Sequence, residues 1–168
     1  APMVIGRANR QDLPFPGPAA YMTMAGFADV EVDTETGIVK VLNYVAGHDS
    51  GRIVNPDICE NQVFGGILQS MGYALTEEVV FDPATGKPLN PVLSDYCIPT
   101  SLDAPPMNVI FSENIDTVGP LGAKAIGEGP AICPHAAIAS AIYNAIGVRI
   151  NELPITPDKV LKALGRIK

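Results

Sequence analysis

Apolar and acidic residues alternate strictly over residues 28–33, which is the period of a strand with one buried face. The next five positions, 33–37, read Asp-Thr-Glu-Thr-Gly and have turn chemistry, because Gly37 can adopt a positive φ. A β-branched segment, residues 38–45, follows directly. The pattern therefore predicts a β-hairpin.

From residue 57 to residue 78 the period changes to that of a helix. Apolar side chains recur at nearly every fourth position: Val63, Ile67, Met71 and Ala74. Three glycines lower the intrinsic helix propensity of this segment: Gly65, Gly66 and Gly72. We expect them to allow close packing against another backbone or a ligand.

Two further short strands are expected, at residues 78–82 and 108–112, and residues 83–88 have the composition of a turn. The 78–82 segment is a short apolar run, and the 108–112 segment follows a proline-rich loop.

The C-terminal part of the chain predicts two helices. The first has Pro134 in its first turn and Gly147 as its stop, with an apolar stripe between them: Ile138, Ile142 and Ile146. The second is short, with Thr156 as N-cap and Pro157 at its first position.

The order of elements predicts an α+β fold, in which a β-hairpin and short strands pack with helices. Residues 1–23 are rich in proline and lack periodicity, so we expect an extended arm that lies on a partner surface. Residues 24–168 are expected to form the folded domain.

The net charge of −7 argues against a nucleic-acid partner, because such binding depends on a basic surface. No apolar run is long enough to span a bilayer, and no signal peptide is visible. Three irregularly spaced cysteines predict neither a disulfide framework nor a zinc site. These features predict a cytoplasmic protein without a membrane partner.

The most informative candidate site is the glycine-rich stretch 119–135, which leads into the predicted helix. Glycines expose backbone N–H groups, and a helix start adds unpaired donors, so the stretch suits an anionic group. It does not match a Walker P-loop or a dinucleotide fingerprint. Its carboxylate, Glu128, is either a general base or a residue that complements the helix dipole. Spacing alone favours the second interpretation.

Other polar residues are weaker candidates. Gln62 could hydrogen-bond a heterocycle or an oxo ligand, although a surface glutamine on a helix is the commoner case. Residues 48–50, His-Asp-Ser, invite a catalytic triad, but adjacent residues cannot easily converge in that geometry. Cys133 could have a lowered thiol pKa at a helix start, but a buried thiol and a polar first-turn His135 are more common. No spacing predicts a metal site made of protein ligands.

Several segments, in order, resemble the molybdenum hydroxylases, the xanthine oxidase and aldehyde oxidoreductase family. Residues 122–128 (GAKAIGE) resemble that family's G-x-K/S-x-x-G-E segment. Residues 51–56 (GRIVNP) and 62–72 (QVFGGILQSMG) resemble the part of the family sequence that precedes this segment. The family's C-terminal end resembles residues 134–142, 147–150 and 153–161.

The resemblance implies a role for each matching residue. Glu128 matches the glutamate that acts as base and activates a molybdenum-bound hydroxyl or water. Gln62 matches a glutamine near the molybdopterin. The loop beside that cofactor matches six residues: Gly122, Ala123, Lys124, Ala125, Ile126 and Gly127. Ala125 stands where many members have glycine, a departure that still allows backbone contacts.

The resemblance also implies that residues 24–168 are the C-terminal part of a larger molybdenum-binding domain, either a fragment or a split subunit, inactive alone. The expected cofactor is molybdenum–molybdopterin, with or without the dinucleotide extension. An iron–sulfur subunit and a flavin subunit would be partners, carrying 2Fe-2S and FAD on other chains or segments. The implied reaction hydroxylates an electron-poor carbon of an aldehyde, a purine or an N-heterocycle. The alternative is a non-catalytic module that binds a partner or an anionic ligand through the glycine-rich loop.

Overall fold

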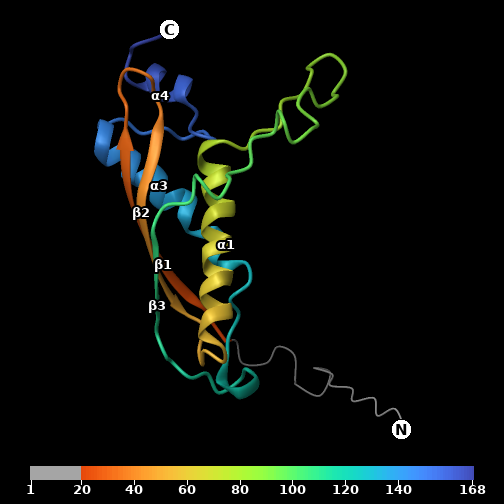
Figure 1. The fold of residues 1–168 in the computed structure, drawn as a ribbon, viewed down its shortest axis with the longest axis vertical. Helices are drawn as coiled ribbons and strands as arrows, with labels where there is room; N and C mark the ends of the chain where they lie inside the picture. The colour runs from red at the N-terminus through yellow and green to blue at the C-terminus, as the bar shows by residue number, and fades with distance from the viewer. Residues whose placement is uncertain (1–19) are drawn as a thin grey trace.

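A computed structural model describes residues 20–168 (Figure 1). Residues 1–19, most of the predicted N-terminal arm, lie outside the described residues. The predicted hairpin is confirmed: β1 (Thr23–Val32) pairs antiparallel with β2 (Val39–Asp49). In the turn, Gly37 has a φ of 79°, and the Asp33 carboxylate accepts backbone N–H groups from within the turn.

The third strand, β3 (Met107–Phe111), lies parallel to β2 on the side opposite β1, so the order is β1-β2-β3. This confirms the strand expected at 108–112. The strand expected at 78–82 is wrong, because within the described part of the chain this segment has no strand to pair with. It folds back on itself, with a single isolated bridge between Phe81 and Pro88, and projects away from the helices (the green loop in Figure 1).

The long helix, α1 (Pro56–Leu75), is capped by Asn55, whose side chain accepts the N–H of Ile58 at 3.2 Å. It ends three residues earlier than predicted, because the carbonyl of Gly72 accepts the N–H groups of both Thr76 and Glu77. Within residues 20–168, no helix is both long and apolar enough to cross a membrane.

The shorter helices follow the glycine-rich loop. A 3-10 turn, η2 (Pro120–Gly122), precedes α2 (Gly129–Ile132), α3 (Pro134–Ile146) and α4 (Pro157–Ala163). The predicted start and end of α3 and the predicted start of α4 are confirmed, with Gly147 as a left-handed C-cap of α3 and Thr156 as the N-cap of α4.

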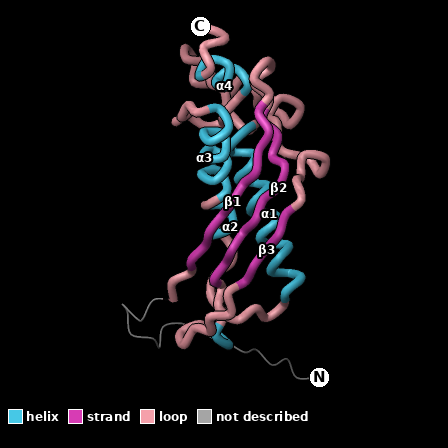
Figure 2. Tube along the Cα trace, turned by 90° about the vertical axis from the view of Figure 1, so that its left-hand side faces the viewer, coloured by secondary structure: helices cyan, strands magenta, loops and turns pink. Residues whose placement is uncertain are grey.

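The fold is α+β, with the sheet in one layer and the helices against one face (Figure 2). One buried cluster joins the turn end of the hairpin to α3, α4 and the second half of α1; its members are Val41, Met71, Ala74, Ile138, Ile142, Ile155 and Val160. The other lies between β2 and the middle of α1 and comprises Tyr44, Ala46, Val63 and Ile67. The two clusters hold β2, α1 and α3 in fixed positions.

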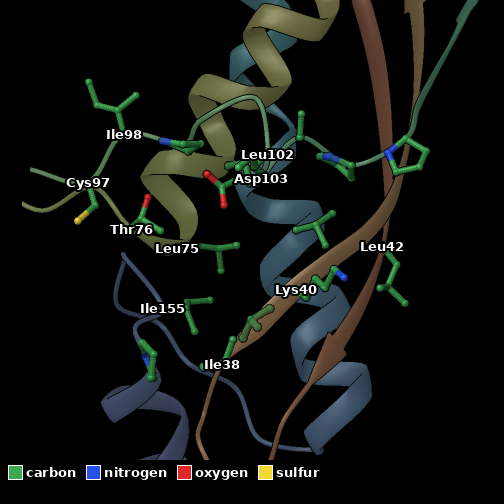
Figure 3. Close-up of a pocket in the computed structure, with 18 residues that line it drawn as sticks. Ile38, Lys40, Leu42, Leu75, Thr76, Cys97, Ile98, Leu102, Asp103 and Ile155 are labelled. Atoms are coloured by element: carbon green, nitrogen blue, oxygen red, sulfur yellow. The ribbon is translucent and has the colours of Figure 1, made fainter.

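An apolar groove of about 810 Å³ lies near the C-terminal end of α1 (Figure 3). Its labelled lining includes Ile38, which precedes β2, together with Leu42 from β2, Leu75 from α1, and Leu102 from the loop after α1. None of the predicted site residues lines this groove.

Candidate active-site loop

The glycine-rich loop is held against the end of β2 by backbone pairing. Arg52 N–H donates to the Gly122 carbonyl at 2.9 Å, and Lys124 N–H donates to the Ser50 carbonyl at 2.8 Å. Between these bonds, Gly51 and Ala123 form an antiparallel bridge. A Cβ on Gly51 would lie 2.3 Å from the Gly122 oxygen, so the two segments can approach this closely because residue 51 is glycine.

The loop's backbone donors fall into two groups. The amides of Gly122, Ala123 and Lys124 all donate to carbonyls of the chain itself. The next three residues, 125–127, donate no backbone hydrogen bond to any group within residues 20–168. The donors open to a ligand are therefore in the second half of the loop, immediately before Glu128.

Gln62 lies on α1 beside this second half. Its side-chain nitrogen donates to the Gly127 carbonyl at 3.3 Å, which joins two predicted site segments that are 65 residues apart. Gly65 lies one turn further along α1, and within residues 20–168 no heavy atom beyond its chain neighbours and the backbone of α1 lies within 4 Å of the position a Cβ would take there. The same is true of Gly127. Gln62, Gly65 and Gly127 thus line an open surface.

Glu128 occupies the N-cap position of α2, with helical φ and ψ of −82° and −29°. Its carboxylate makes no capping hydrogen bond, and the residue is exposed. Within the described residues the Glu128 carboxylate is therefore exposed and not tied to α2 by a hydrogen bond, while its place at the helix start also suits an interaction with the helix dipole.

A backbone N–H at the start of α3 donates to Ser70, a residue of α1. The buried Ser70 Oγ accepts the N–H of His135 at 3.0 Å and lies 3.1 Å from His135 Nδ1. This helix start was expected to offer donors to an anion, but Ser70 occupies the His135 amide. Because Ser70 lies on α1, 65 residues away, no local signal could have indicated it.

Ser70→Ala is expected to destabilise the protein by about 1–2 kcal/mol, because the part-buried His135 N–H loses its acceptor. The exposed Ser140→Ala, on α3 itself, is the matched control and should change stability little. Thermal unfolding of both variants measures the difference. Equal midpoints for the two variants would contradict the role assigned to Ser70.

Residues 48–50 do not form a triad, because successive residues of a strand point to opposite faces. His48 and Ser50 are buried under the sheet, and burial lowers the pKa of His48. Asp49 points the other way and binds Lys124, with 2.7 Å between Oδ2 and Nζ. This hydrogen bond from Lys124 lowers the pKa of Asp49. Within residues 20–168, no three His, Cys, Asp or Glu side chains gather as metal ligands.

Comparison with known proteins identifies related chains over most of this length. The aldehyde oxidoreductase molybdenum-binding subunit PaoC of Escherichia coli is 40% identical over 144 residues, which cover 84% of this chain and 20% of the relative. The putative xanthine dehydrogenase molybdenum-binding subunit XdhA of the same organism is 40% identical over 134 residues, covering 80% and 18%. The crystal structure of quinoline 2-oxidoreductase from Pseudomonas putida superposes with a TM-score of 0.77 at 34% identity, covering 83% and 18%.

The chain spans about a fifth of the length of the curated relatives it matches. The match to PaoC covers 84% of the chain, so it includes both Gln62 and the loop 122–128. The family model for the molybdopterin cofactor-binding domain matches residues 5–105, which include Gln62 and end before the loop. The chain belongs to the molybdopterin cofactor-binding domain family.

Proposed function

We propose that this chain forms one wall of the cofactor site in a molybdenum-dependent hydroxylase or dehydrogenase, with Glu128 as its catalytic base. The observation that carries the proposal is the bond from Gln62 to Gly127, which sets the α1 amide beside the loop residue that precedes Glu128. Family membership supports the same assignment.

The open surface has the groups that a pterin cofactor needs. A fused heterocycle with a phosphate presents both donors and acceptors. The amides of Ala125, Ile126 and Gly127 are donors, and the Gln62 side chain has an acceptor oxygen. We propose that these four residues contact the cofactor, while Gly122, Ala123 and Lys124 support the loop from behind.

When bound, the molybdenum cofactor supplies a redox centre that takes two electrons from the substrate. Glu128 contributes the acid–base part of the reaction. Its carboxylate accepts a proton from the water-derived oxygen as the new C–O bond forms, and later releases that proton to solvent. A base in this role must be held in position, which Gly127 and α2 do on either side of Glu128.

The names of the relatives support a class of substrate and not a single compound. The names of these relatives refer to an aldehyde, xanthine and quinoline, which supports an electron-poor carbon of an aldehyde, a purine or an N-heterocycle as the target. The proposed partners are the remaining molybdenum-binding segment, an iron–sulfur subunit and a flavin subunit, assembled in the cytoplasm. The chain would be inactive without them.

Native purification of the assembly tests the proposal. Molybdenum, measured by metal analysis, and pterin, measured by its fluorescence after oxidation, are expected to copurify with this chain. A stable, monodisperse and metal-free chain that elutes without partners would contradict the proposal and favour a non-catalytic binding module.

A further inference from the structure

Lys124 belongs to the glycine-rich loop, yet its ammonium group is bound by the chain itself. Nζ lies 2.7 Å from Asp49 Oδ2 and donates to the Tyr21 carbonyl at 3.1 Å. Both side chains are largely withdrawn from solvent, with exposed fractions of 6% for Lys124 and 15% for Asp49. Removing one partner of such a pair leaves an uncompensated charge in a poorly solvated place.

Asp49 collects further donors at the same point. Its carboxylate accepts the Gly51 N–H at 3.3 Å and the Asn114 side-chain nitrogen at 3.5 Å. The ion pair therefore joins the end of β2, the segment after β3 and the glycine-rich loop. It coincides with the backbone pairing of residues 50–52 with 122–124, so the same few residues are fixed by side chain and backbone together.

Beyond Lys124 the loop has few internal restraints until Glu128. Residues 125–127 donate no backbone hydrogen bond within residues 20–168. The next anchor is the Gln62 bond to Gly127, and α2 follows. The path that leads to the Glu128 carboxylate is thus held at one end by Lys124 and at the other by Gln62.

We propose that Asp49 and Lys124 are positioning residues for Glu128, and that their partly buried ion pair, not contact with the cofactor, is the function of Lys124. The proposal rests on the proposed function of Glu128 as base. A base displaced by about 1 Å loses on the order of 10²-fold in rate. Loss of the pair should therefore slow turnover with little effect on substrate affinity.

The test uses the assembled enzyme with the variants Asp49→Asn, Lys124→Met and Lys124→Arg, and the double variant of the first two. Backbone hydrogen exchange is measured on the peptide that covers residues 119–130, together with kcat, KM and molybdenum content. The matched control is Lys159→Met, because Lys159 has the same kinds of partner: the Glu152 carboxylate at 3.2 Å and the Pro154 carbonyl at 3.0 Å.

We expect Asp49→Asn and Lys124→Met to speed exchange of the hydrogen-bonded amides of Gly122, Ala123 and Lys124 and to lower kcat about 10- to 100-fold, with KM and molybdenum content near wild type. The double variant should lose no more than the worse single variant, because one interaction is removed in all three. Lys124→Arg should restore most of the rate, and the Lys159→Met control should match wild type.

Wild-type exchange and kcat in Lys124→Met would overturn the proposal, as would a loss confined to KM or molybdenum content, which would indicate a cofactor contact. A wild-type assembly without molybdenum or turnover would instead overturn the proposed function. In that case faster exchange in the two variants would still support the ordering of the loop by the pair, and unchanged exchange would reject it.

Discussion

Replacing Glu128 with glutamine is expected to lower kcat by about 10²- to 10⁴-fold, the usual contribution of a general base. Glutamine keeps the shape and hydrogen-bonding capacity of the side chain but cannot accept the proton. Since no capping bond ties the Glu128 carboxylate to α2, the substitution should leave the helix and the loop in place. The rate is measured in the assembled enzyme, with whichever of an aldehyde, a purine or quinoline the wild type oxidises.

Molybdenum content separates a lost base from a lost cofactor. We expect it to stay at the wild-type level in Glu128→Gln, because the proposed cofactor contacts come from Gln62 and the loop backbone. Glu113→Gln is the matched control, since Glu113 is also an exposed glutamate in a loop, and its variant should retain full activity. Turnover by Glu128→Gln at a rate near that of wild type would contradict the assignment of the base.

Local patterns were sufficient for elements whose stability is largely local. The hairpin, the C-cap of α3 and the N-cap of α4 depend on residues within a few positions of one another, and all three were predicted. The strand expected at 78–82 failed for the opposite reason. Its apolar pattern is suited to a strand, but a strand requires a partner, and within the described residues this segment has only its own return at Phe81 and Pro88.

The candidate site shows the same contrast between features set by neighbouring residues and features set by contacts between distant residues. Spacing alone could not decide whether Glu128 caps a helix or takes a proton, and the resemblance to a family drew attention to Gln62 and the loop. The contacts that arrange the site join distant positions: Gln62 to Gly127, Asp49 to Lys124, and Ser70 to His135. Such pairs form because α1 and β2 pack against the later loop. The periodicity of apolar residues along the sequence does not predict this packing.

The structure also distinguishes the roles of two glycines in α1, Gly65 and Gly66. The sequence predicted that they permit close packing against a backbone or a ligand. Gly66 does the first, because its Cβ position lies against Pro130 and Ala131 of α2. Gly65 faces the open surface beside Gln62, where the proposed cofactor would lie. The absence of a side chain thus serves close helix packing at Gly66 and leaves an open surface at Gly65.

Gly66→Ala is therefore expected to destabilise the protein by about 3 kcal/mol, the upper end of typical overpacking costs. The added Cβ would lie 2.5 Å from Pro130 Cβ and 2.8 Å from the Pro130 carbonyl carbon, and a backbone atom cannot rotate aside. Relief requires α2 to move away from α1. Because Glu128 immediately precedes α2, kcat should fall as well, and thermal unfolding together with steady-state kinetics of the assembled enzyme would measure both effects.

Gly65→Ala provides the matched control for the stability measurement alone, because residue 65 lies beside the proposed cofactor. In the part of the chain that the structure describes, its new methyl group meets no atom of another segment within 4 Å. The expected effect is therefore the better helix propensity of alanine, a gain of up to about 1 kcal/mol. The two substitutions are chemically identical and one residue apart, yet they should shift the unfolding midpoint in opposite directions. Shifts of the same sign and size would show that α1 and α2 do not pack through Gly66 in the assembled protein. Glu128 would then be held only from its N-terminal side, by the Gln62 bond to Gly127.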